Sequence, residues 1–273
     1  MAQLAHAARD TWSSKWAFIL AAAASAVGLG NLWRFPYLAA KYGGGMFLLT
    51  YLVLVFTFGL SLLLVEIALG RKTRQSTIGA FKLFGKKYAF IGILASLVPF
   101  IITPYYCVIG GWVAKYVGAY FFDPATMIGD GGTYFSSFIT SSFESYIWLF
   151  IFMAIVFFVV SRGIKGGIEK ANLIMMPALI IMTVILVVYT LCQPGALDGA
   201  AYYLVPDFSA FSIELVVAAL GQMFFSLSIA MGIMVTYGSY MKQRDSCCGL
   251  RYWRFVLGRS HDRAGGVRCA GLA

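Results

Sequence analysis

The residues best suited to bind a ligand interrupt an apolar segment at residues 16–40. Gly28, Gly30, Asn31 and Arg34 stand within this segment. A helix that crosses a bilayer must satisfy its own backbone polar groups, so irregular backbone survives there only where it is packed in protein or lines a cavity. Carbonyls freed by unwinding are hard oxygen ligands for a cation, and amides at the start of the outer half-helix suit a carboxylate. We therefore expect a discontinuous helix whose break binds a small ligand.

A second interruption, within residues 211–240, has the same character. Ser226 and Ser228 stand among small residues there, and Gln222 precedes them by about one helical turn. Two interrupted spans at corresponding places in two halves of a chain point to the binding site of a secondary transporter. Serine and glycine also let membrane helices pack closely, so simple packing is an equal alternative for the second interruption taken alone.

Composition predicts the elements that carry these residues. The chain has 273 residues, is 60% hydrophobic and 12% charged, and has a mean hydropathy of +0.81. A soluble domain would have roughly twice that charged fraction, so we predict an all-α integral membrane protein. An apolar run of about 20 residues crosses a bilayer as a helix. The predicted spans are residues 16–40, 45–69, 89–121, 147–161, 171–192 and 211–240.

Charge alternates between the loops that join these spans. Residues 70–88 and 162–170 are rich in lysine and arginine, whereas residues 122–146 and 193–210 carry only acidic charges. Basic loops stay cytoplasmic, which predicts a multi-pass protein of the plasma membrane with its amino terminus in the cytoplasm. The net charge of +10 then orients the chain in the lipid bilayer and does not indicate a nucleic-acid partner.

Enzyme chemistry finds little support in the sequence. The five cysteines show no C-x-x-C spacing, and His6 and His261 lie near the two ends, so no metal site of the zinc type is predicted. No predicted span pairs a nucleophile with a histidine. Gly28 and Gly30 lack the third glycine and the strand context of a dinucleotide site. We predict that the protein is not an enzyme.

Several motifs give the chain a similarity to a known family, and they are residues 12–15, 26–37, 43–45, 66–71, 104–106, 166–170 and 221–228. Through them, the sequence resembles the neurotransmitter:sodium symporter family, particularly its bacterial amino-acid transporters, over roughly residues 9–242. The resemblance implies a LeuT-type fold, comprising the first five-helix repeat plus the sixth helix, with discontinuous helices 1 and 6. It also implies sodium-coupled symport of an amino acid, with sodium ions and the amino acid as ligands.

The resemblance further assigns site residues. It implies a first sodium site at Ala26, Asn31 and Ser226 and a second at the carbonyls of Ala24 and Val27. The implied substrate-binding residues are Ala26, Leu29, Gly30, Ile102, Tyr106, Phe225, Ser226, Ser228 and Met231. The implied gating residues are Arg9 and Trp12 on the inner side, and Arg34, Gln222, Tyr106 and Phe225 on the outer side.

Three further residues carry expectations about the site. Monoamine-transporting relatives have an aspartate at the position of Gly28, so glycine here favours an amino-acid substrate. Met231 is flexible and polarizable and would admit a bulky apolar side chain, with ordinary helix packing as an equal alternative. Glu66 resembles the residue that braces the unwound part of the sixth helix, and a protonated donor between helices is its alternative role.

The resemblance also divides the chain. Residues 1–241 are expected to form a transmembrane domain that is truncated relative to the family. Residues 242–273 are basic and unlike the family's next span, which favours a frameshifted tail over a genuine basic cytoplasmic tail. A non-transporting truncated membrane protein, or an interaction subunit, is the alternative function. The identity of the amino acid, chloride dependence and a homo-oligomeric state stay open.

Overall fold

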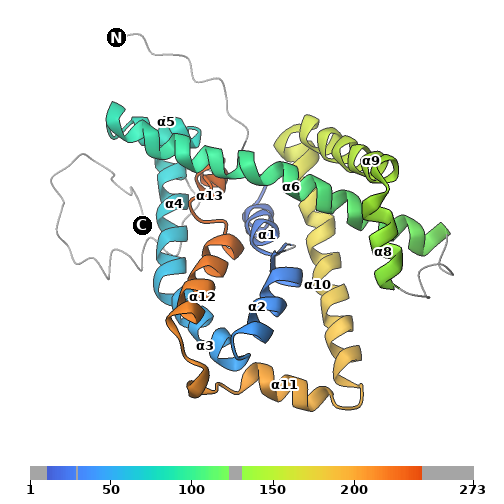
Figure 1. Cartoon of the computed structure of the whole chain (residues 1–273). Coiled ribbons are helices and arrows are strands. Elements are labelled where there is room, and N and C mark those ends of the chain that lie inside the picture. Colours follow the sequence, from blue (N-terminus) through green and yellow to red (C-terminus); the bar gives the residue numbers. More distant parts are fainter. Residues whose placement is uncertain (1–10, 29, 123–130, 242–273) are drawn as a thin grey trace, which may run out of the picture.

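The structure is a computed structural model that describes residues 11–28, 30–122 and 131–241, and these residues are mostly helical (Figure 1). The α-helices are α1 (Lys15–Ala26), α2 (Phe35–Lys41), α3 (Gly45–Leu54), α4 (Leu60–Thr73), α5 (Thr77–Lys82), α6 (Ala89–Phe122), α8 (Gly131–Thr140), α9 (Ser142–Ser161), α10 (Lys170–Leu191), α11 (Ala196–Leu204), α12 (Ile213–Ser226) and α13 (Ile233–Ser239). Short π-helical turns are η1 (Gly30–Arg34), η2 (Val55–Gly59) and η4 (Ile164–Glu169), and 3₁₀ turns are η3 (Lys86–Tyr88) and η5 (Phe208–Ala210).

Membrane-spanning length is reached by several of these helices. Within the described ranges, four continuous helices are long and apolar enough to cross a bilayer: Gly45–Thr73, Lys86–Phe122, Phe143–Ser161 and Ile164–Leu191. At most 11% of the most apolar window of each is buried inside the chain, as expected for helices that face lipid. The fourth and fifth spans begin earlier than predicted, because each helix continues through polar residues that lie outside its apolar run.

The first predicted span is broken, which confirms the expectation from its glycines. Helix α1 ends at Ala26, and Val27 is extended, with φ −102° and ψ 99°. The chain resumes in η1 and continues into α2, which is bent by 46° from α1. Pro36 lies at the amino-terminal end of α2, where the missing backbone N–H of proline removes no helical hydrogen bond.

The sixth predicted span is broken as well. Helix α12 stops at Ser226, and α13 starts only at Ile233, so neither helix alone has the length of a span. Within the break, Ser228 and Ala230 have left-handed backbone, with φ of 52° and 62°. This conformation costs a residue with a side chain about 1–2 kcal/mol. The break is therefore strained and needs stabilising contacts from neighbouring elements.

Close helix packing holds α13 in place against α4. A Cβ added at Gly70 on α4 would overlap the carbonyl oxygen of Val235, and one at Gly238 on α13 would lie 2.5 Å from the carbonyl oxygen of Ile67. Small residues let membrane helices approach closely and gain van der Waals contact. In Figure 1, α13 lies beside α4 and α12 beside α3, and the α1–α2 pair lies between them and α10. The two broken spans are therefore neighbours in the fold.

Candidate functional site at the junction of two broken helices

Three groups from the two breaks meet through short hydrogen bonds. The Asn31 side chain donates from Nδ2 to the Ala26 carbonyl at 2.7 Å. The Ser226 hydroxyl, on the last turn of α12, donates to Asn31 Oδ1 at 2.6 Å. A chain of hydrogen bonds through the Asn31 amide therefore joins the two spans. These residues are the ones that the family resemblance implies for the first sodium site.

Gln222 adds a second layer of polar contacts at this junction. Its side chain is fully buried, and Nε2 donates to the Gly30 carbonyl at 3.2 Å and to Ser226 Oγ at 3.0 Å. Its Oε1 atom is buried without a hydrogen-bond partner within the described residues. An unpaired buried acceptor costs roughly 1–3 kcal/mol, so this oxygen is available to a donor or cation that enters the site.

Polar contacts also support the break of the sixth span. The Ser228 hydroxyl donates to the Ser25 carbonyl at 2.9 Å, and the two hydroxyls lie 3.2 Å apart. The Ala230 N–H donates to Glu66 Oε1 at 2.7 Å. Glu66 therefore contacts the break of the sixth span. These bonds stabilise the left-handed segment that its own backbone geometry disfavours.

A cavity of about 320 Å³ lies beside this junction. Every predicted substrate-binding residue lines it except Leu29, which lies outside the described residues. Its wall also includes Cys107, Phe152 and Val156, which sequence reasoning missed. The last two face the cavity from α9, whose long apolar run gives no signal that distinguishes a cavity wall from a lipid-facing side. On α6, Pro99, Thr103 and Cys107 follow one another at four-residue intervals and so share one face of the helix. This spacing could have identified Cys107 as part of the cavity wall.

Aromatic and cationic groups border the cavity where η1 and α12 meet. The rings of Tyr106 and Phe225 have centroids 6.2 Å apart, and the Arg34 guanidinium lies 5.5 Å from the Phe225 centroid. Within the described residues, Arg34 and Gln222 do not form the implied polar pair, because Gln222 bonds inward to Gly30 and Ser226. A Cβ at Gly30 would come within 2.6 Å of Phe225 Cδ1, so only glycine permits this ring position.

The segment that precedes α1 packs against the end of α13 and against η4. Trp12 is buried, its Nε1 donates to the Tyr237 carbonyl at 3.0 Å, and its N–H donates to the Tyr240 carbonyl at 3.1 Å. Ser13 bonds through both its N–H and its hydroxyl to the buried Glu169 carboxylate of η4. The segment thus joins α13 to η4. Arg9, the other residue implied for an inner gate, lies outside the described residues.

The residues implied for a second sodium site are less gathered. Ala24 lines a separate cavity of about 460 Å³, together with Thr77, Asn172 and Thr236. Val27 is 38% exposed in the extended segment that follows α1. The structure therefore assembles the groups of the first implied site more completely than those of the second.

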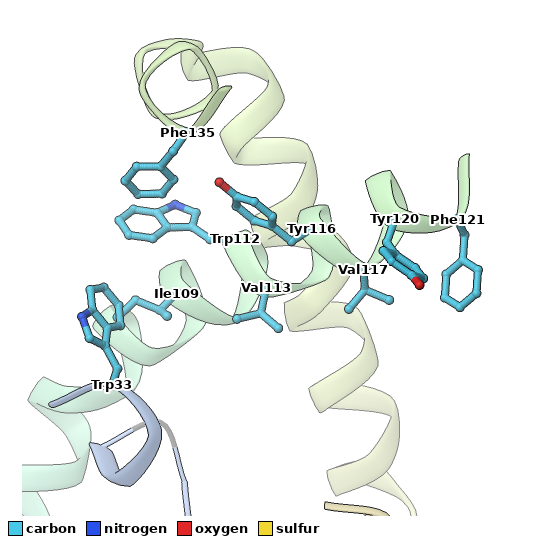
Figure 2. Close-up of a pocket in the computed structure, with 9 residues that line it drawn as sticks. All are labelled: Trp33, Ile109, Trp112, Val113, Tyr116, Val117, Tyr120, Phe121 and Phe135. Carbon is cyan, nitrogen blue, oxygen red and sulfur yellow. The ribbon is translucent and has the colours of Figure 1, made fainter. Parts of the chain in front are cut away.

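A larger cavity, of about 570 Å³, lies along the carboxyl-terminal part of α6 (Figure 2). Figure 2 shows Trp112 between Phe135 of α8 and Trp33, with Phe121 at the far end of the group. The Trp112 and Phe135 rings pack edge to face, with centroids 5.3 Å apart. Its lining has no charged side chain and no carboxamide, so it lacks the ligands that a cation or a zwitterion needs. The smaller cavity, which Asn31, Ser226 and Ser228 line, is therefore the better candidate for a polar ligand.

Comparisons with known proteins agree with this geometry. The model of the sodium:neurotransmitter symporter family matches residues 9–127 and 135–250. An uncharacterised sodium-dependent transporter, MJ1319 of Methanocaldococcus jannaschii, is 39% identical over 254 residues, covering 87% of this chain and 50% of the relative. The Bos taurus sodium-dependent neutral amino acid transporter B(0)AT2 is 29% identical over 271 residues, covering 88% and 37%.

A solved structure gives the same result at the level of the fold. The crystal structure of MhsT in complex with L-phenylalanine matches with a TM-score of 0.80 and 36% identity, covering 87% of this chain and 55% of MhsT. The chain spans about half the length of MJ1319 and of MhsT. The helices, the two breaks and the family match together show that the chain belongs to the sodium:neurotransmitter symporter family.

Proposed function

We propose that this chain belongs to a transporter that moves an amino acid together with sodium across the plasma membrane, with the amino terminus in the cytoplasm. The observation that carries the proposal is that Asn31 links the Ala26 carbonyl to Ser226 Oγ by two hydrogen bonds, beside a cavity that all three residues line. Hard oxygen atoms are the ligands that alkali cations accept, and a buried cation cannot recruit bulk water cheaply. A sodium ion would replace the two hydrogen bonds that now join these groups.

The substrate class follows from the cavity wall. Gly28 leaves open space, since a Cβ placed there meets nothing within 4 Å, and it supplies no carboxylate to pair with a lone amine. A zwitterionic amino acid would bring its own carboxylate to the ion and its amine to the backbone carbonyls of the breaks. The apolar wall formed by Ile102, Val156 and Met231 favours a bulky apolar side chain, and the L-phenylalanine bound by MhsT supports this choice.

Access to the site would be controlled on both sides. Tyr106 and Phe225, capped by Arg34, would act as the outer lid, because the Phe225 ring separates the guanidinium from the cavity. Trp12 would act as the inner gate, with Arg9 as its implied companion. Ala24 and Val27 would contribute to a second sodium site.

Sodium-dependent substrate binding tests this proposal. We expect the reconstituted chain to bind radiolabelled L-phenylalanine in sodium chloride and not in potassium chloride. Ser226→Ala should weaken this binding, whereas Ser61→Ala, which removes an exposed hydroxyl bonded to its own helix, should not. Equal binding in both salts would refute the proposed ion coupling. Gradient-driven uptake by the same proteoliposomes separates a transporter from the alternative, a membrane polypeptide that does not transport by itself.

A further inference from the structure

We propose that residues 82–88, here termed the basic turn, form an interfacial site for anionic phospholipid headgroups. The turn joins α5 to α6 and reads Lys-Leu-Phe-Gly-Lys-Lys-Tyr. Lys82, Lys86 and Lys87 are exposed, and within the described residues none of the three has an ion-pair partner. The sequence has no acidic residue between Glu66 and Asp123, so no carboxylate on the adjoining elements competes for them.

Large apolar side chains are exposed among these lysines. Leu83 is 60% exposed, Phe84 57% and Tyr88 41%. The basic turn adjoins the membrane span Lys86–Phe122, so these side chains lie where the chain enters the bilayer. Aromatic side chains favour the headgroup level of a membrane, and a basic cluster beside a span attracts anionic lipid. Apolar insertion and charge attraction together give a stronger membrane contact than either gives alone.

The geometry of the basic turn is fixed by the fold. Gly85 has a φ of 137°, which reverses the chain between Phe84 and Lys86. Helix α5 is pressed against α6 at Gly92, where a Cβ would lie 2.7 Å from Ile78 Cα. Figure 1 shows α5 beside the first turns of α6, at the end of α4 opposite α3. The lysines are thus presented from a packed helix pair.

The same helix touches the break of the sixth span. Thr77, the first residue of α5, donates its buried hydroxyl to the Gly232 carbonyl at 3.1 Å. Gly232 precedes α13 directly, with a φ of 70°. A lipid bound at the basic turn therefore contacts α5, which is hydrogen-bonded to the strained break of the sixth span, beside the cavity of about 320 Å³. Through this connection, the lipid composition of the membrane can influence the conformation of the break in the sixth span.

Spin-labelled lipids in proteoliposomes test the site. The measured quantity is the association of spin-labelled phosphatidylglycerol relative to phosphatidylcholine. A lysine near the membrane surface contributes about 1 kcal/mol of attraction, or roughly fivefold. We expect the triple variant Lys82→Gln, Lys86→Gln, Lys87→Gln to lower the preference for phosphatidylglycerol at least fivefold. Unchanged preference in this variant would overturn the proposal.

A matched control separates a site from general surface charge. The triple variant Arg162→Gln, Lys165→Gln, Lys170→Gln removes the same charge from the other basic loop. It should leave the preference within twofold of wild type, and an equal loss would overturn the proposal. The unmodified chain gives an independent readout, because the preference should collapse between 0.05 and 0.5 M salt if charge drives it. A preference that survives high salt would contradict the assignment to the lysines.

Discussion

Replacing Asn31 by alanine is the most direct test of the cation site. Asn31 makes two short hydrogen bonds, from Nδ2 to the Ala26 carbonyl and from the Ser226 hydroxyl to Oδ1. In the variant, Ser226 still accepts from Gln222, but its hydroxyl loses its acceptor and the Ala26 carbonyl loses its donor. The ion-free protein should therefore lose about 1–3 kcal/mol of stability.

The effect on sodium should be separate from this loss. Asn31→Ala removes an oxygen ligand, and an interaction with a charged group is worth about 1.5–3 kcal/mol, which is roughly a 10- to 150-fold change in affinity. A ligand present at 100 times its dissociation constant stabilises a protein by about 2.7 kcal/mol. A tenfold weaker site reduces that sodium-specific stabilisation to about 1.4 kcal/mol at the same concentration.

Thermal unfolding in sodium chloride and in potassium chloride, at constant ionic strength, measures this difference. We expect the half-saturating sodium concentration to rise at least tenfold in Asn31→Ala and to stay unchanged in Ser61→Ala. A wild-type value in Asn31→Ala would refute the role of the Asn31 oxygen. Equal stability of the wild-type chain in both salts would refute sodium binding by this chain.

Three further results are expected. Gly28→Asp should abolish amino-acid binding in a radioligand assay, whereas Gly28→Asn should largely preserve it. The position has space for either side chain, and only the aspartate places a charge in the cavity. Equal binding by the two variants would contradict this reasoning. Gly70→Ala should cost about 1–3 kcal/mol in thermal unfolding, because its methyl group meets the α13 backbone, whereas Gly221→Ala meets nothing within 4 Å and should not destabilise. In a cysteine-free background, Lys82→Cys should react with an impermeant thiol reagent only after the cells are permeabilised, whereas Asp198→Cys should react in intact cells. The opposite result would show that the predicted topology is reversed.

Sequence reasoning succeeded where the chain must break a helix. Glycine and serine in an apolar run are costly for a spanning helix, and both predicted breaks are present, after Ala26 and after Ser226. The contacts of Asn31 followed from the family resemblance, because only a known fold specifies that residues about 195 positions apart will meet.

The parts that could not be predicted have physical reasons. Ala230 adopts a left-handed backbone that its residue type disfavours, and only the tertiary bond to Glu66 explains why it does so. Phe152 and Val156 look like any lipid-facing pair until α9 is placed beside the cavity. Ser13 and Glu169 lie 156 residues apart, and no local pattern connects them.

The two breaks are best understood as a single structure. Each one alone leaves backbone groups without helical partners, which is costly in a membrane. Here the groups of one break satisfy the other: the Gly30 carbonyl accepts from Gln222, the Ser25 carbonyl accepts from Ser228, and Asn31 accepts from Ser226. Groups that repair two broken helices must be rich in oxygen and must converge, and these are also the requirements of a cation site. Because the bonds cross between the spans, an ion that replaces some of them also changes how firmly the spans hold each other. An ion bound at this junction would therefore be coupled to the relative positions of the two helices.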